Sequence, residues 1–166
     1  TSPFELSPEQ IAAAKVMVVD DDELVTSSLS SFFALELELD PIIFNESPKA
    51  LEFLRENPVD ILISDFLMPK LDGIQLLAAA RELQPEVPRV LLTGYADKEN
   101  AIKAINEVGV FQYIEKPWEN EQLKQVVING LTRLLLMRLL TDKMGELQNT
   151  REDLAGLKKA LVRAFA

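Results

Sequence analysis

The 166-residue sequence contains neither cysteine nor histidine. Without cysteine the chain can form no disulfide and no thiolate-bound metal site, and this composition fits a cytoplasmic location. Without histidine it lacks the commonest general base, and it cannot itself donate a phosphoryl group from phosphohistidine. Any chemistry must therefore come from carboxylates, hydroxyls and lysine.

Long apolar runs and a basic surface are also missing. No segment approaches the roughly 20 apolar residues that span a bilayer, because two arginines interrupt the most apolar one, 131–140. The first residues lack the basic-then-apolar order of a signal peptide. The formal net charge of −10 opposes binding to nucleic acid, which requires a basic surface. We expect no membrane insertion and no nucleic acid binding by this segment.

Short apolar runs alternate with stretches of helical periodicity. Five runs are predicted to form buried strands: 15–19, 40–44, 59–65, 90–93 and 111–115. Helical spacing or capping residues follow each of them, at 23–39, from 47, at 74–83, at 97–107 and from 119. This alternation is typical of an α/β protein with a doubly wound, five-stranded parallel sheet. We expect one domain at 15–131, preceded by an N-terminal extension, 1–14, with a short helix near Ser7.

Polar residues at the starts of these helices are predicted to cap them. We expect Ser47, which precedes a proline, to be the N-cap of the second helix and Asp97 that of the fourth. Asp22 is expected to cap the first helix, and Asp72 to form the turn into the third and cap it. These residues set the expected helix boundaries.

The pattern changes to one long helix from residue 119 onward. Four leucines are spaced by seven, with methionines three residues before the first two: Leu140, Leu147, Leu154, Leu161, Met137 and Met144. This spacing predicts a coiled-coil seam of about three heptads within 132–166. Arg151 and Lys158 occupy the other two seam positions. The helix could pack on its own domain, but its length of roughly 60 Å favours a partner, so we expect a homodimer through this C-terminal helix.

Four of the predicted strands stop abruptly at polar residues. In chain order, the residues at these ends are Asp20-Asp21-Asp22, Asp65, Thr93 and Lys116. In a parallel sheet such ends lie along the carboxyl edge, where open α/β sheets bind ligands. Carboxylates, a hydroxyl and an ammonium gathered there suit Mg²⁺ and a phosphoryl group.

These side chains have the chemistry for phosphoryl transfer to a carboxylate. An ionised aspartate such as Asp65 can attack a phosphoryl group directly and needs no general base. Mg²⁺ held by neighbouring carboxylates neutralises the phosphoryl oxygens, while Lys116 and Thr93 supply positive charge and a hydrogen-bond donor. Each group also has an ordinary explanation as a helix start, a cap or a turn, so the hypothesis depends on their occurring together.

Four segments resemble those of a known family: Val18-Val19-Asp20-Asp21-Asp22; Ile63-Ser64-Asp65-Phe66-Leu67-Met68-Pro69 with Asp72-Gly73; Leu92-Thr93-Gly94-Tyr95; and Tyr113-Ile114-Glu115-Lys116-Pro117. In order and separation, over about 15–131, they resemble the receiver domain of bacterial two-component response regulators. The resemblance implies a flavodoxin-like fold with strand order 2-1-3-4-5 and a signalling switch rather than an enzyme. It also implies a histidine kinase or a phosphotransfer protein as the phosphodonor.

The resemblance assigns roles at the phosphorylation site. Asp65 would be the phosphoacceptor, and Lys116 would pair with the phosphoryl oxygens. Mg²⁺ would be held by Asp20, Asp21 and Asp65 together with the backbone carbonyl of Leu67. Asp21 would bind the metal directly and Asp20 through water.

The resemblance also assigns roles in switching. Thr93 would be the switch hydroxyl that moves toward the phosphoryl group, and Tyr113 the aromatic residue that rotates inward behind it. The peptide bond between Lys116 and Pro117 is expected to be cis. The change would pass through the surface of the fourth helix, fifth strand and fifth helix, and along the long C-terminal helix, to dimerisation or an output domain.

Two other classes fit parts of the sequence. A haloacid-dehalogenase-like phosphatase also has Asp-x-Asp after an apolar run, as at Asp20 to Asp22. Such an enzyme needs a second acidic pair after a later lysine, and more chain to cover its substrate. A receiver-like docking or dimerisation module would keep the fold without phosphoryl chemistry, which the complete set of site residues argues against. Turnover of a phosphate ester would identify the first class, and failure to accept a phosphoryl group the second.

Overall fold

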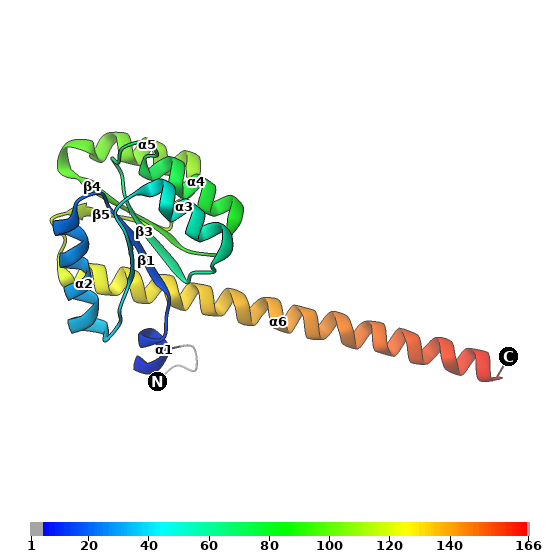
Figure 1. Cartoon of the computed structure of the whole chain (residues 1–166). Helices are drawn as coiled ribbons and strands as arrows, with labels where there is room; N and C mark the ends of the chain where they lie inside the picture. Colours follow the sequence, from blue (N-terminus) through cyan, green and yellow to red (C-terminus); the bar gives the residue numbers. More distant parts are fainter. Residues whose placement is uncertain (1–4, 166) are drawn as a thin grey trace. The chain divides into compact units, whose positions relative to one another are not determined.

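The computed structural model describes residues 5–165, without the side chains of residues 95, 104, 161, 164 and 165. The elements, shown in Figure 1, are α1 Pro8–Ala12, β1 Val16–Val19, α2 Glu23–Leu37, β2 Ile42–Phe44, α3 Ser47–Glu56, β3 Ile61–Asp65, α4 Gly73–Leu83, β4 Arg89–Gly94, a 3-10 turn Tyr95–Asp97, α5 Lys98–Val108, β5 Gln112–Lys116 and α6 Asn120–Phe165. The short helix expected within 1–14 is α1. The chain divides into two compact units, Thr1–Leu134 and Leu135–Ala166.

The five strands form one parallel sheet in the order β2-β1-β3-β4-β5, which confirms the predicted doubly wound topology. In β1, Val18 pairs with Ile43 of β2 on one side and with Ile63 of β3 on the other. The residues of β1, β3 and β4 are almost all buried. Strands covered on both faces are mostly apolar along their length; the buried Ser64 in β3 and Arg89 at the start of β4 are exceptions.

Helices cover both faces of the sheet. In Figure 1, α2 and the start of α6 lie on one face, and α3, α4 and α5 lie on the other. Because successive strand side chains point to opposite faces, Val18 and Ile63 join one core while Val19 and Leu62 join the other. Each large apolar side chain buried in this way contributes roughly 1.5–3 kcal/mol. These two cores hold the strand ends in register at the carboxyl edge.

Two of the predicted caps make their hydrogen bonds. The Asp22 carboxylate accepts a hydrogen bond from the backbone N–H of Leu24 at 2.9 Å and so caps α2. Asp72 forms a reciprocal capping box with Gln75 at the start of α4. Asp97 occupies the N-cap position of α5, but its side chain makes no capping hydrogen bond. The boundaries of α2 and α4 therefore follow from local sequence.

The predicted N-cap of α3 is wrong. The helix begins at Ser47 itself, with Glu46 at the N-cap position and without a side-chain capping bond. The Ser47 hydroxyl donates instead to the backbone carbonyl of Leu71, at 2.6 Å. Ser47 is buried, and a buried hydroxyl needs a hydrogen-bond partner. This bond ties the start of α3 to the loop before α4.

The long C-terminal helix is α6. Within the first unit its side chains include the fully buried Leu123 and Val127. In the second unit the predicted seam residues are largely exposed: Leu140 by 63%, Met144 by 62%, Leu147 by 65% and Leu154 by 62%. The side chain of Leu161, the last predicted seam residue, lies outside the described ones. In the part of the chain that the structure describes, no helix is both long and apolar enough to cross a membrane.

Candidate functional site

The residues predicted at the strand ends meet at the carboxyl edge of the sheet. The Lys116 ammonium, at the end of β5, donates hydrogen bonds to Asp20 Oδ2 at 2.9 Å and to Asp65 Oδ1 at 2.8 Å. The peptide bond between Lys116 and Pro117 is cis, as the resemblance implied. Because Asp20 follows β1 and Asp65 ends β3, one cation joins residues from three strands.

The Asp20 carboxylate is fully buried. Its Oδ1 atom accepts a hydrogen bond from the backbone N–H of Asp22 at 2.9 Å. Its backbone carbonyl accepts one from Nδ2 of Asn45 at 2.9 Å, and the same Asn45 amide donates to the Thr26 hydroxyl at 3.0 Å. Asn45 therefore holds the start of the acidic segment in place. Asn45 is not among the predicted site residues, although it follows an apolar run in the same way as the residues at the four predicted strand ends.

Burial has the largest effect on the pKa values of Asp65 and Lys116, which are hydrogen-bonded to each other. Desolvation, together with the charge of Asp20, raises the pKa of Asp65, and the hydrogen bond from Lys116 offsets this only in part. Desolvation lowers the pKa of Lys116, but hydrogen bonds from its ammonium to Asp65 and Asp20, with their charges, outweigh this effect and raise it. Lys116 is therefore a cation across neutral pH, while the ionised form of Asp65 is held at a free-energy cost.

A divalent cation fits the carboxylates at this edge. Oxygen atoms of Asp20, Asp21 and Asp65 lie within 4.8 Å of one another. Hard cations such as Mg²⁺ prefer oxygen ligands of this kind. The Lys116 ammonium pairs with two of these three carboxylates, Asp20 and Asp65, so the cluster can take further positive charge. Asp20 is buried, whereas Asp21 is exposed, so the cluster is open to solvent on the side of Asp21.

Gly73 sets the path of the loop that follows Asp65. A Cβ atom at this position would lie 1.9 Å from the backbone oxygen of Asp65. The Gly73 N–H also donates to the Phe66 carbonyl at 2.9 Å. The sequence predicts only a turn and a cap at the Asp72-Gly73 pair. The close approach adds a second requirement, because only glycine fits against the main chain of Asp65.

Gly73→Ala is expected to lower the free energy of unfolding by about 2–3 kcal/mol, because the added methyl group must displace the backbone of Asp65. Urea denaturation measures this. Gly145→Ala is the matched control, since a Cβ there meets no atom within 4 Å, and alanine should stabilise that exposed helix by up to about 1 kcal/mol. Equal stability of Gly73→Ala and the parent chain would contradict the close approach.

Thr93 is fully buried at the end of β4. Its hydroxyl donates to the backbone carbonyl of Gly94 at 3.2 Å, so in this structure the hydroxyl hydrogen-bonds neither Asp65 nor Lys116. The hydrogen bond is local and long for an O–H donor. Thr93 thus carries a hydroxyl that could move to a new acceptor at little cost.

Tyr113 lies on the same face of the sheet as Thr93. It pairs with Leu91 in β4, two residues before Thr93, and residues two apart share a face. The Tyr113 side chain is half-buried against the core beneath α3, α4 and α5. With Lys98 and Lys116, among others, it lines a hollow of about 550 Å³. The structure therefore brings the two predicted switch residues onto neighbouring strands.

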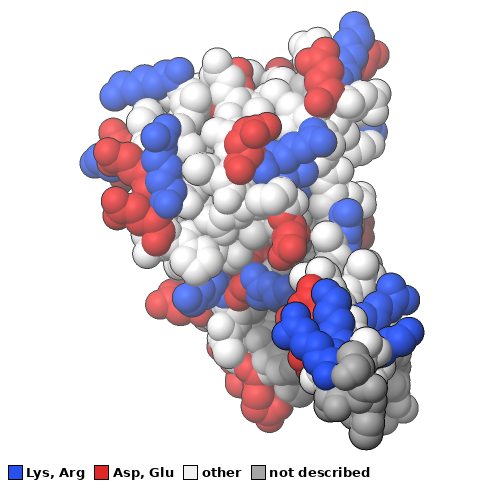
Figure 2. Space-filling model, turned by 90° about the vertical axis from the view of Figure 1, so that its right-hand side faces the viewer, with Lys and Arg blue, Asp and Glu red and all other residues white. Residues whose placement is uncertain are grey.

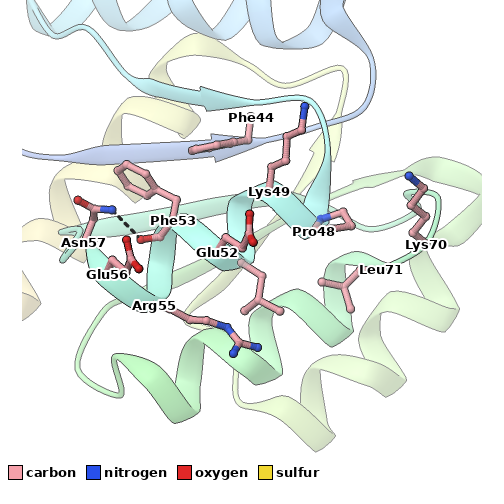
Figure 3. A pocket seen from close by; sticks show the side chains of 11 residues that line it. Phe44, Pro48, Lys49, Glu52, Phe53, Arg55, Glu56, Asn57, Lys70 and Leu71 are labelled. Atoms are coloured by element: carbon pink, nitrogen blue, oxygen red, sulfur yellow. Dashed lines mark hydrogen bonds between the residues drawn. The ribbon is translucent and has the colours of Figure 1, made fainter.

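A second hollow, of about 1150 Å³, lies along α3 and is shown in Figure 3. The rings of Phe44 and Phe53 lie 5.2 Å apart in it. Lys49 also lines it and pairs with Glu46 at 2.7 Å. None of the residues predicted for phosphoryl chemistry lines this hollow.

The fold and the edge together define the class, a flavodoxin-like α/β domain with an acidic, lysine-bridged site at its carboxyl edge. Residues 16–128 match the model of the response regulator receiver domain, and the chain belongs to that family. The resemblance found in the sequence is thereby confirmed. Receiver domains are signalling modules of two-component systems, which agrees with a switch rather than an enzyme.

Relatives and solved structures agree with this family. The hydrogenase transcriptional regulatory protein HoxA from Cupriavidus necator is 35% identical over 114 residues, which is 69% of this chain and 23% of that protein. The regulatory protein AtoC from Escherichia coli is 29% identical over 150 residues, 90% of this chain and 29% of that protein. The chain thus spans less than a third of either relative. A response regulator receiver domain protein from Clostridium thermocellum superposes with a TM-score of 0.69 at 28% identity, covering 75% of this chain and 98% of that one.

Proposed function

We propose that this chain is a phosphorylation-dependent switch that accepts a phosphoryl group on Asp65 from a histidine kinase or a phosphotransfer protein in the cytoplasm. The bridge from Lys116 to Asp20 and Asp65 supports this most directly, because it places a cation beside the acceptor carboxylate and one member of the acidic pair. Burial of Asp20 and exposure of Asp21 suit a site that is anchored in the core and open to a phosphodonor.

In the transfer step, a carboxylate oxygen of Asp65 bonds to phosphorus while the P–N bond of the donor phosphohistidine breaks, and the departing imidazole takes a proton from solvent. Asp20, Asp21, Asp65 and the backbone carbonyl of Leu67 would hold Mg²⁺. Bound there, Mg²⁺ neutralises charge on the phosphoryl oxygens. Lys116 exchanges its hydrogen bond with Asp65 Oδ1 for one with a phosphoryl oxygen, which keeps its charge paired.

Switching follows from the added charge, which is nearly −2 at neutral pH. The Thr93 hydroxyl leaves the Gly94 carbonyl and donates to a phosphoryl oxygen, and Tyr113 turns into the space behind it. A nearly complete shift between two states needs about 5 kcal/mol, and a few charge-assisted hydrogen bonds at about 1.5–3 kcal/mol each supply that. The change reaches the surface formed by α5, β5 and the start of α6.

Thr93→Val should still accept a phosphoryl group, more slowly than the parent chain, but lose the conformational response, because valine keeps the shape and removes the donor. Trp118, the single tryptophan, lies two residues after Lys116, and its fluorescence on phosphorylation measures the response. Thr132→Val is the control, since the Thr132 hydroxyl bonds Ile128 within α6. An unchanged fluorescence response in Thr93→Val would contradict this role.

In this proposal the chain has three parts: an N-terminal extension at 1–14, a receiver domain at 15–131 and a helical linker at 132–166. The linker forms a coiled coil with a second copy through its seam up to Leu147 and passes the change to dimerisation or to an output domain. Its apolar stripe at Leu140, Met144 and Leu147 is exposed in a single chain. Burial of such a stripe is the usual driving force for coiled-coil pairing.

Leu147→Asp should raise the dimer dissociation constant about a hundredfold, because it places a charge in the seam. Light scattering across a dilution series measures this. Asn149→Asp is the matched control: it adds the same charge two residues away, on the face opposite the predicted seam. Equal masses for both variants at every concentration would contradict pairing through this stripe.

Intact-mass measurement after incubation with acetyl phosphate and Mg²⁺ tests the proposed function. We expect a gain of one phosphoryl group that requires Mg²⁺ and is absent from Asp65→Asn. No gain with acetyl phosphate or with a phosphorylated kinase domain would overturn the proposal and favour a receiver-like docking module.

A further inference from the structure

The distal part of α6 carries two cations on its predicted seam. Beyond Leu147 the predicted seam continues through Arg151, Leu154 and Lys158, which we call the distal seam. Arg151 and Leu154 are three residues apart and Leu154 and Lys158 four, so all three lie on one face of the helix. All three side chains are exposed. The distal seam therefore combines an apolar side chain with two cations.

The carboxylates of this region lie on the other side of the helix. Glu152 and Asp153 fall between the seam positions, away from the stripe. No Asp or Glu stands three or four residues from Arg151 or Lys158, the spacings at which helical side chains meet. Accordingly, neither cation forms an ion pair with any residue that the structure describes.

The part of the predicted seam before Arg151, which we call the proximal seam, carries no cation. Met144 and Leu147 are apolar, and the flanking Lys143 is already paired with Glu146, at 3.2 Å. Figure 2 shows lysine and arginine side chains gathered around the distal end of α6. Residues 135–147 thus suit pairing with an identical helix. The cations of the distal seam do not.

Pairing of the distal seam with a second copy would oppose like charges. In a parallel, in-register pair, Arg151 faces its own counterpart and so does Lys158, with no carboxylate from either chain at the seam. Like charges in such positions are destabilising. A partner helix with glutamate or aspartate at the matching positions would neutralise both cations while burying Leu154.

We infer that residues 150–162 of α6 are a docking surface for an acidic amphipathic helix of another protein. The seven-residue spacing of Arg151 and Lys158 matches the repeat of a partner helix. A membrane surface fits less well, because membrane-binding helices carry their cations on the polar face, whereas these two lie within the leucine stripe. The inference does not depend on phosphorylation of Asp65.

Two designed helical peptides of about three heptads test this. Each heptad has two seam positions, and both peptides carry leucine at one of them. At the other seam position the first peptide carries glutamate and the second carries lysine. Binding is measured by fluorescence anisotropy with the full chain carrying Asp65→Asn, which cannot be phosphorylated at residue 65. The glutamate peptide should bind at least about tenfold tighter than the lysine peptide. Added salt should reduce that preference.

Charge reversal supplies the decisive variant. Arg151→Glu with Lys158→Glu should invert the preference toward the lysine peptide, whereas Lys159→Glu, off the seam, should leave it unchanged. Circular dichroism establishes that each variant stays helical. Equal binding of the two peptides, or a preference that survives the double reversal, would overturn the inference. So would stronger binding to phosphatidylglycerol vesicles than to the glutamate peptide.

Discussion

Lys116→Ala is expected to lower the free energy of unfolding by about 3–5 kcal/mol in metal-free buffer. The substitution removes the ammonium that donates to both Asp20 and Asp65, at 2.9 and 2.8 Å. Asp20 has no exposed side-chain surface, so its charge would be left buried without a cation. Loss of one partner from a buried pair costs this much because the remaining charge is uncompensated. Urea denaturation followed by circular dichroism measures it.

Magnesium should distinguish this loss from a general packing defect. If the carboxylates hold Mg²⁺, millimolar Mg²⁺ should restore part of the stability of Lys116→Ala and stabilise it more than the parent chain. Lys98→Ala is the control: Lys98 and Glu115 are 3.7 Å apart, with 41% and 33% of their side chains exposed. Such a surface pair contributes little, about 0–1 kcal/mol. Equal losses in the two variants, or no effect of Mg²⁺ on Lys116→Ala, would contradict the account.

Asp65→Asn should stabilise the metal-free protein at neutral pH. Burial and the charge of Asp20 raise the pKa of Asp65, so the folded state holds a proton more tightly than the unfolded state does. The contribution of Asp65 to stability therefore falls as pH rises through the window between its ordinary and its raised pKa, and it stays low above that window. Asparagine is neutral at every pH and escapes this loss.

Unfolding measured from about pH 3 to pH 7 tests the sign of this effect. The stability advantage of Asp65→Asn should be largest at neutral pH and should vanish as pH falls below the ordinary pKa of an aspartate. Asp142→Asn, on the exposed part of α6, reports the effect of removing one negative charge from a chain with a net charge of −10. An advantage no larger than that of the control would show that Asp65 is not held at a cost.

The sheet and its edge could be predicted because parallel strands covered on both faces are mostly apolar along their length, so that polar residues gather near their ends. Asp65, Thr93 and Lys116 follow that rule, and so do the residues after β1. Asn45 follows it too, but its run is short and only partly buried, and the preceding Asp40 weakens the apolar signal. The polar residues at the ends of β1, β3, β4 and β5 could therefore be predicted, whereas Asn45 after β2 could not.

Two features of the site depend on contacts that local sequence does not encode. Ser47 stands before a proline, which is typical of an N-cap. Its hydroxyl instead donates a hydrogen bond to the backbone carbonyl of Leu71, in the loop before α4. Gly73 appears as an ordinary turn residue, yet it is required because the main chain of Asp65 passes against it. Both contacts are tertiary: one joins the start of α3 to the loop before α4, and the other joins the start of α4 to the end of β3. Tertiary structure, not propensity, decides them.

Reductive trapping of the acyl phosphate tests the central claim most directly. The chain is incubated with acetyl phosphate, with Mg²⁺ or with a chelator, then reduced with borohydride and mapped by peptide mass spectrometry. The account predicts conversion of Asp65 to homoserine in the presence of Mg²⁺ and none with the chelator. Conversion at Asp20, Asp21 or Asp72 instead, or conversion at Asp65 that is independent of Mg²⁺, would contradict it.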